Sequence, residues 1–256
     1  MSKASLDKNW EKLNKNPDYY ERCYLAKDYL SELDDKDSAN QLFAQAVEDA
    51  ETLKDNTTDY LCAIVDIARF MSDDDFDIPG GKKLVEKVIE SNDYHALEQV
   101  INLYYDIGAS EDEIKSVRER MLSNEAINNL EDHYSKTVKI IDVVHNSAHE
   151  YGFDWEQDYL KQAESFANDK EDFYSLLQFY FWSKGDYEPY GNKYSEYLEK
   201  YIKLIDDAAE YDQLACLVLD ESTQEAIGFW EKAIEIETDE DCIQNYKDSI
   251  KDYSDS

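Results

Sequence analysis

Turn residues are scarce in this chain, and their scarcity limits the folds open to it more than any other feature. Only 7 Gly and 3 Pro occur in 256 residues. A sandwich or barrel of many strands needs a turn signal about every 8–12 residues, whereas helices joined by short polar turns need far fewer. The sequence therefore predicts an all-α protein.

Composition indicates a folded and strongly acidic chain. Hydrophobic residues make up 42% of the sequence, with 21 Tyr, 9 Phe and 4 Trp, which is enough apolar mass for a core. The 26 Lys and Arg stand against 60 Asp and Glu, which gives a formal charge of −34. We therefore expect no direct binding of nucleic acid through a basic face, and a partner protein that is itself basic.

Nothing in the sequence indicates export or membrane insertion. The start, MSKASLDKNWEKLNKN, lacks the apolar core of a signal peptide. No window approaches the ~18 apolar residues of a membrane span. We expect a soluble, cytoplasmic protein with no membrane contact. Cys23, Cys62, Cys216 and Cys242 stand far apart, which favours buried reduced thiols over a disulfide or metal framework.

Apolar residues recur with helical periodicity along the chain. Residues 173–182, FYSLLQFYFW, are apolar on nearly every helical face, so we expect an enclosed helix there. A short strand is the competing interpretation of such a run. The helices predicted from the whole pattern are 6–14, 18–33, 37–54, 58–71, 80–91, 93–107, 110–123, 125–150, 154–168, 171–184, 190–208, 210–220, 222–237 and 239–253.

Several helix starts carry a capping signal. Ser110 followed three residues later by Glu113 predicts a capping box, in which side chain and backbone satisfy each other's free donors. We expect Ser38 to cap the helix that contains Phe43, and Asp239 to cap the last helix.

Two segments interrupt the helical pattern. Residues 72–81 hold Pro79 and two glycines, and residues 185–191 hold Pro189. Proline and glycine in these positions predict that no helix continues through them. We expect one helical-repeat domain over residues 1–256, with a possible subdivision at these two breaks.

The chain also resembles itself. Residues 59–70, DYLCAIVDIARF, align with residues 93–104, DYHALEQVINLY, at a displacement of 34 residues. This is the length of one helix–turn–helix unit. Apolar residues fall at matching helical positions in the two segments. We therefore predict that they are equivalent helices of neighbouring repeats.

A second internal similarity joins the two ends of the chain. Residues 38–50 align with residues 224–236, and each has a small residue, an aromatic four positions later and Ala three after that. A small side chain lets two helices approach, and the aromatic ring fills the groove beside it. The residues concerned are Ala39, Phe43 and Ala46 in one segment, and Ala226, Trp230 and Ala233 in the other.

This pattern resembles the second helix of the tetratricopeptide (TPR) and Sel1-like repeats, most closely in residues 225–237, EAIGFWEKAIEIE. The resemblance implies a right-handed superhelical stack, an α-solenoid, of about five to six helix-turn-helix hairpins. It also implies a noncatalytic module whose concave side binds a segment of another protein. Such an inference rests on likeness of fold.

Few residues carry a catalytic or metal-binding signature. His145 and His149 stand four apart on one predicted helix and could hold a metal ion. A metalloprotease helix would have Glu after the first His, whereas this chain has Asn146, and a packing role for His145 on the apolar side is the alternative. A deep pocket that gathered both histidines with His133 would favour an enzyme.

The acidic turn that follows the fourth predicted helix does not match a calcium loop. Asp73, Asp75 and Asp77 alternate, but Ile78 and Leu84 occupy the places where an EF-hand needs Gly and Glu. No phosphate-binding glycine loop or nucleophile elbow occurs either. We therefore predict no catalytic residue, no cofactor and no metal ligand.

Tyr194, Tyr197 and Tyr201 form an amphipathic stripe with spacings of three and four residues. Tyrosine can bury its ring while its hydroxyl reaches water. Such a stripe suits either a seam between two helices or a surface that binds a partner. These three tyrosines are the candidate partner-binding residues.

Charge is distributed unevenly along the chain. Residues 205–256 carry 16 acids and 3 bases, whereas residues 1–27 carry 4 acids and 6 bases. Our leading hypothesis is an acidic, noncatalytic scaffold or adaptor that binds a basic partner protein. The alternative is an acidic DNA mimic that inhibits a nuclease or another DNA-binding protein, because acids beside aromatic rings imitate phosphates and bases.

Overall fold

The protein is all-helical. This computed structural model describes residues 2–73, 76–130, 135–147, 151–185 and 188–254. Helices hold 81% of these described residues, and none of them lies in a β-strand. The all-α prediction is confirmed. The run 173–182 lies in a helix, so the strand interpretation of that run is wrong.

The chain divides into two compact units, residues 1–132 and residues 133–256. The sequence breaks at 72–81 and 185–191 fall inside these units, one in each, and the division lies between them.

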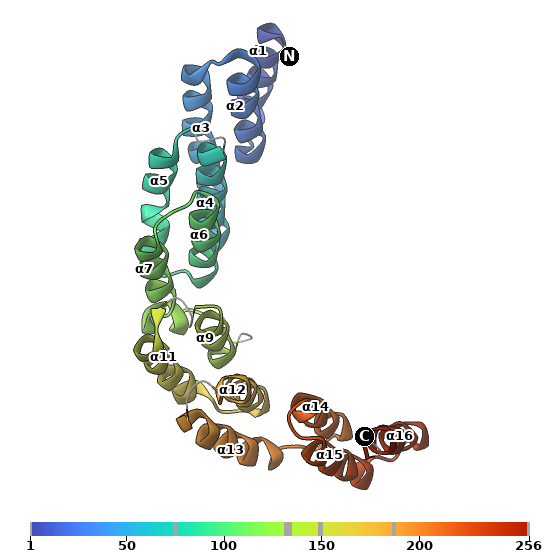
Figure 1. Ribbon diagram of the computed structural model, residues 1–256. Helices are drawn as coiled ribbons and strands as arrows, with labels where there is room; N and C mark the ends of the chain where they lie inside the picture. Colours follow the sequence, from blue (N-terminus) through green and yellow to red (C-terminus); the bar gives the residue numbers. More distant parts are fainter. Residues whose placement is uncertain (1, 74–75, 131–134, 148–150, 186–187, 255–256) are drawn as a thin grey trace. The chain divides into compact units, whose positions relative to one another are not determined.

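Unit 1 is built from neighbouring helix pairs. Helix α2 packs against α3, α4 against α5, and α6 against α7, while α2 contacts α4 and α4 contacts α6 (Figure 1). The first helices of successive pairs therefore form one layer. The elements of unit 1 are α1 (Lys3–Leu13), α2 (Tyr19–Leu33), α3 (Lys36–Ala50), the 3-10 turn η1 (Glu51–Leu53), α4 (Thr57–Ser72), α5 (Ile78–Glu90), α6 (Tyr94–Asp106), α7 (Glu111–Met121) and α8 (Asn124–Asn128).

Unit 2 repeats this pairing. Helix α9 packs against α11, α12 against α13, and α14 against α15, while α9 contacts α12 and α16 packs on α15 (Figure 1). The elements of unit 2 are α9 (Lys136–His145), α11 (Phe153–Phe166), α12 (Lys170–Ser183), α13 (Glu188–Ile202), α14 (Ala208–Val218), α15 (Thr223–Ile236) and α16 (Glu240–Ser254).

The single helix predicted over residues 125–150 is wrong. Helix α8 ends at Asn128, and α9 begins only after Ser135, whose Oγ accepts the backbone N–H of Val138 at 3.0 Å. Asn and Ser side chains compete for backbone hydrogen bonds and so favour helix ends over helix interiors. Apolar residues keep their helical spacing across the junction between α8 and α9, so the periodicity alone did not indicate where one helix ends and the next begins.

Both predicted proline breaks are helix starts. Pro79 lies at the second position of α5, where a backbone N–H is not needed for the helix. Asp77 accepts the backbone N–H of Gly80 at 3.0 Å and caps this helix. Pro189 likewise lies at the second position of α13. The prolines therefore set where a helix begins after a turn.

Gly81 marks a close approach between α4 and α5. A Cβ atom at this position would lie 2.4 Å from the Oγ of Ser72 and 2.8 Å from the carbonyl oxygen of Ala68. Any larger residue would push the two helices apart, so glycine is required here for packing.

The pattern of small and aromatic residues in the second internal similarity has one register in both helices, although the aligned segments 38–50 and 224–236 differ from that register by one residue. Helix α3 is capped by Asp35 and α15 by Ser222, each four residues before the first small residue of the pattern. Ser38 was expected to cap α3 but lies inside its first turn, where its Oγ donates to Asp35. All six residues of the pattern are buried: Ala39, Phe43, Ala46, Ala226, Trp230 and Ala233.

The same register extends to two further helices. In α5 and α7, as in α3 and α15, the residues four, eight and eleven positions after the cap are buried. Each of these helices is the second member of its pair. In α5 the residues are Gly81, Val85 and Val88, and in α7 they are Ile114, Arg118 and Met121.

The first internal similarity is out of register by about one helical turn. Asp59 lies three residues after Asn56, the cap of α4, whereas Asp93 is itself the cap of α6. Both segments are first helices of their pairs, but the displacement of 34 residues does not superimpose their caps. A slip of three residues keeps an amphipathic stripe on nearly the same face, which explains the false register.

Candidate functional site

The three candidate tyrosines lie in a helix seam. Tyr194, Tyr197 and Tyr201 are at most 8% exposed. The ring of Tyr197 stacks on Tyr180 of α12 with centroids 5.7 Å apart, and Tyr201 packs on Tyr174 at 5.0 Å. The stripe therefore joins α13 to α12, which is the helix seam that the sequence offered as one interpretation.

Burial and neighbouring charges keep the hydroxyl groups of these tyrosines protonated. Burial raises the pKa of Tyr201 to about 12, and those of Tyr194 and Tyr197 are raised further by burial and nearby glutamates. The Nζ of Lys200 lies 4.3 Å from the centroid of the Tyr197 ring. A lysine of α13 itself therefore lies over the ring of Tyr197 as a cation–π contact.

The histidines do not form a site among the described residues. His145 ends α9 and is exposed, which corrects its placement on the apolar side of the helix, although its ring meets the edge of Phe179 at 6.3 Å. His149 and His133 lie outside the described residues. No group of three potential metal ligands was found in the part of the chain that the structure describes.

The acidic turn between α4 and α5 has structural contacts at its two described aspartates. Asp77 caps α5, and an oxygen of Asp73 lies 2.7 Å from the Nζ of Lys27. Asp75 lies outside the described residues.

The four cysteines are free thiols, but they are not all buried. Cys23 is buried, Cys62 and Cys242 are partly exposed, and Cys216 is exposed, which corrects the expectation for that residue. Burial raises the pKa of Cys23 to about 12 and that of Cys62 to about 11. A thiol with a raised pKa is a poor nucleophile.

Sequence reasoning missed an exposed group of aromatic rings in unit 1. We call Tyr20, Tyr24 and Phe70 the α2–α4 aromatic patch. Tyr20 is 43% exposed and Tyr24 49% exposed. The centroids of Tyr20 and Tyr24 are 5.2 Å apart, and Phe70 lies 5.4 Å and 5.0 Å from them, all edge to face. The three rings form one rigid surface across two helices.

The start of α2 orients these tyrosines. Asp18 accepts the backbone N–H groups of Tyr20 and Glu21, each at 3.0 Å, and so caps the helix. Tyr20 and Tyr24 are four residues apart and share a face. Apolar residues on the other side, including Leu25 and Ala26, are buried. The pairing of α2 with its neighbours thus leaves the two tyrosines facing solvent.

A partly buried carboxylate lies beside the patch. The hydroxyl of Tyr19 donates to Asp66 at 3.4 Å, and Arg69 lies 3.5 Å from the same carboxylate. Burial raises the pKa of Asp66, and burial together with Asp66 raises the pKa of Tyr19 to about 12. Aromatic rings and a carboxylate are thus adjacent on the layer of first helices.

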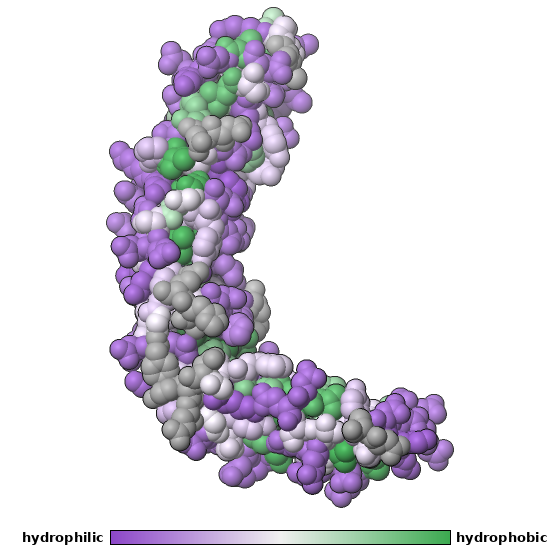
Figure 2. All heavy atoms as spheres, viewed as in Figure 1, coloured by the Kyte–Doolittle hydropathy of each residue, from purple (hydrophilic) through white to green (hydrophobic). Residues whose placement is uncertain are grey.

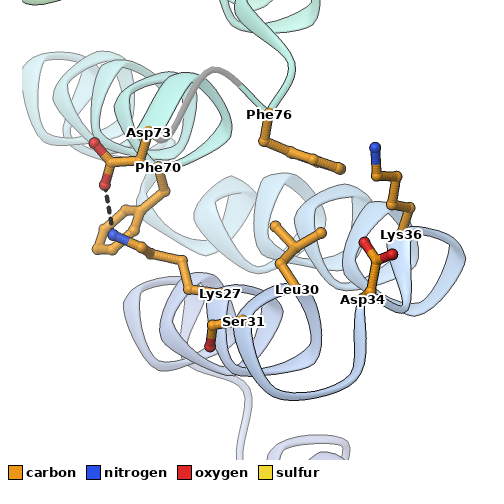
Figure 3. Close-up of a pocket in the computed structure, with 8 residues that line it drawn as sticks. All are labelled: Lys27, Leu30, Ser31, Asp34, Lys36, Phe70, Asp73 and Phe76. Atoms are coloured by element: carbon orange, nitrogen blue, oxygen red, sulfur yellow. Dashed lines mark hydrogen bonds and ion pairs between the residues drawn. The ribbon is translucent and has the colours of Figure 1, made fainter.

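A cavity of about 320 Å³ adjoins the patch (Figure 3). Leu30 of α2 and Phe76 lie on facing sides of it, and Phe70 joins it to the patch. The Nζ of Lys27 lies 5.8 Å from the centroid of Phe70 while it pairs with Asp73. The other lining residues are Ser31, Asp34 and Lys36. An apolar floor with a charged rim suits one anchoring side chain of a partner.

Polar residues dominate the face of the protein shown in Figure 2. Against such a surface, exposed rings held together on neighbouring helices are the feature most typical of a recognition site.

Every helix in the described ranges is too short or too polar to span a bilayer. No family model matches this chain, and no curated protein or solved structure is significantly similar to it.

Proposed function

We propose that this protein is a noncatalytic interaction module that binds a segment of a basic partner protein across α2 and α4. The observation that carries the proposal is the α2–α4 aromatic patch, in which two of three mutually packed rings are more than 40% exposed. Tyrosines held rigid at a surface lose little conformational entropy on binding, and they often dominate the affinity of an interface.

The proposal includes the architecture. The helix pairs form a right-handed, superhelical stack of degenerate tetratricopeptide-like hairpins. Its support is the common register of four second helices, in which residues four, eight and eleven after each cap are buried. In such a stack each pair adds a strip to one extended binding face, formed by the first helices.

The net charge of the protein determines how fast it associates with a basic partner. A formal charge of −34 attracts a basic partner and raises the rate of association, and salt screens this effect. The aromatic rings act at short range and depend little on salt. We therefore expect an association rate that falls with ionic strength and a dissociation rate that is set by the patch.

Affinity capture from the native cell tests the proposal. The baits are the wild type, Tyr20→Ala/Tyr24→Ala, and the matched Tyr20→Phe/Tyr24→Phe, which keeps both rings. Leu204→Ala, which removes an exposed apolar side chain from unit 2, is a second control. A basic protein should be retained by the wild type and both controls. The double alanine variant should bind it at least about tenfold more weakly, a loss of about 1.4 kcal/mol. Equal binding to that variant would refute the proposed site.

The DNA-mimic function is favoured by one observation, the excess of carboxylates over bases. It predicts that this protein displaces duplex DNA from its partner, and that neutralising acids weakens binding more than removing the two tyrosines. Competition with a fluorescent duplex distinguishes the two functions, because a partner segment bound on the aromatic patch leaves its own DNA contacts free.

A further inference from the structure

A second recess lies in unit 2, between the first helices α9 and α12. Its volume is about 380 Å³. It is lined by Ile141, Asp142, His145 and Asn146 of α9 and by Ser175, Gln178, Phe179 and Trp182 of α12. None of these residues belongs to the α2–α4 aromatic patch. We call this recess the α9–α12 pocket.

Trp182 is the unusual member of this lining. It ends the apolar run of α12, which was expected to be enclosed, yet its side chain is 58% exposed. Phe181 contacts it edge to face, with centroids 5.0 Å apart, and Phe181 is itself buried. The indole is therefore anchored along one edge by the core while most of its surface faces solvent. Among the exposed large apolar residues of the described chain, it is the most exposed.

The polar groups of the pocket favour a cation. Asp142 is the one acidic residue in the lining, and no lysine or arginine lines the pocket. The surrounding protein displaces water from its carboxyl and raises its pKa, while Lys139 and His145 oppose this effect. The side chains of Asn146, Ser175 and Gln178 add oxygen atoms that can accept hydrogen bonds. An anion would be repelled both by the Asp142 carboxylate and by the net charge of −34.

We propose that the α9–α12 pocket binds the guanidinium group of an arginine side chain, stacked on Trp182 and paired with Asp142. A planar guanidinium stacks on indole and donates in a fork that matches a carboxylate, whereas the ammonium of lysine is more strongly hydrated and does neither as well. The physiological source of this arginine, a basic protein segment, rests on the proposed function. The pocket itself is testable without that partner.

The test is a titration of the full-length 15N-labelled protein with the tripeptide acetyl-Gly-Arg-Gly-amide. The matched probe is acetyl-Gly-Lys-Gly-amide, at the same salt of about 0.15 M. The indole N–H resonance of Trp182 is identified by its absence in Trp182→Phe. We expect a saturable shift of this resonance with the arginine peptide, at a Kd of about 1–10 mM, and a Kd at least about fivefold weaker with the lysine peptide.

Variants separate the pocket from general attraction to a polyanion. Asp142→Asn should weaken arginine binding at least about threefold, whereas Asp158→Asn, which removes the same charge from an exposed position on α11, should leave it unchanged. Trp182→Ala should abolish the saturable shifts of the other pocket residues. The same spectra report whether each variant is folded.

Three results would overturn the proposal: no saturable shift up to about 50 mM peptide, equal affinity for the two peptides, or equal effects of Asp142→Asn and Asp158→Asn. The Tyr20→Ala/Tyr24→Ala variant should bind the arginine peptide like the wild type. Failure of the α2–α4 site and failure of the α9–α12 pocket are therefore distinguishable.

Discussion

Replacing Trp230 by alanine should destabilise unit 2 strongly. The indole is 3% exposed on α15, between the buried small residues Ala226 and Ala233. Its Nε1–H donates to Asp212 of α14 at 2.7 Å, and its ring stacks on Tyr253 of α16 at 5.6 Å. One side chain therefore joins three consecutive helices.

The magnitude follows from these contacts. Removal of a buried Trp side chain costs about 3–5 kcal/mol in lost transfer energy and cavity formation. The hydrogen bond adds about 1 kcal/mol, because the carboxylate of Asp212 is only partly buried and regains water once the indole is gone. We expect a total loss of about 4–6 kcal/mol. Trp230→Phe keeps a ring and should lose about 1–2 kcal/mol.

Urea unfolding followed by far-ultraviolet circular dichroism measures the loss, and hydrogen exchange locates it. Because the chain has two compact units, faster exchange should be confined to residues 133–256 and should be greatest in α14 and α15. A loss below about 1 kcal/mol, or faster exchange in residues 1–132, would refute the packing argument and the repeat register that rests on it.

Three further predictions concern glycine packing, a capping carboxylate and salt. Gly81→Ala should destabilise the protein by about 1–3 kcal/mol because the added Cβ would clash with α4. Gly228→Ala should stabilise it by about 0.5–1 kcal/mol, because no atom lies within 4 Å of the added Cβ and alanine favours the helix. Thermal unfolding measures both changes. Lys82 and a backbone N–H lower the pKa of Glu113 to about 2. The carboxylate therefore contributes fully to folding stability above pH 4.5, the ordinary pKa of glutamate, and this contribution is lost as the pH falls through about 2. The stability difference between the wild type and Glu113→Gln should therefore shrink between these pH values, and a difference that stays constant would show that this carboxylate has no role. Raising salt from about 0.05 to 0.5 M should slow hydrogen exchange in residues 222–253, since it screens repulsion between their carboxylates; faster exchange would mean that ion pairs stabilise this segment instead.

Local chemistry made much of the fold predictable. The capping box of Ser110 and Glu113 is confirmed, and Asp239 accepts the backbone N–H groups of Asp241 and Cys242 as the predicted cap of the last helix. These signals act within one helical turn, so a sequence displays them completely. The pattern of small and aromatic residues could also be recognised in the sequence, because the close packing of two adjacent helices determines which side-chain sizes fit at these positions.

The candidate site was less predictable because exposure is decided by distant residues. Tyr20 and Tyr24 on α2 and Tyr197 and Tyr201 on α13 have the same side chain and the same four-residue spacing on amphipathic helices. Helix α12 covers the second pair, whereas the first pair stays exposed. The spacing of tyrosines predicts a stripe but not which stripe a neighbouring helix covers. The sequence has a local signal at the α2–α4 aromatic patch, the doublet of Tyr19 and Tyr20 after the capping aspartate.

The most direct test of the central claim is to locate the bound partner. Hydrogen exchange of the full-length protein, with and without the basic protein that it captures, reports which helices the partner covers. Binding across the α2–α4 aromatic patch predicts slower exchange in Tyr19–Leu33 and Thr57–Ser72, and loss of this protection in the Tyr20→Ala/Tyr24→Ala variant. Protection confined to other helices, with these two unchanged, would contradict the account.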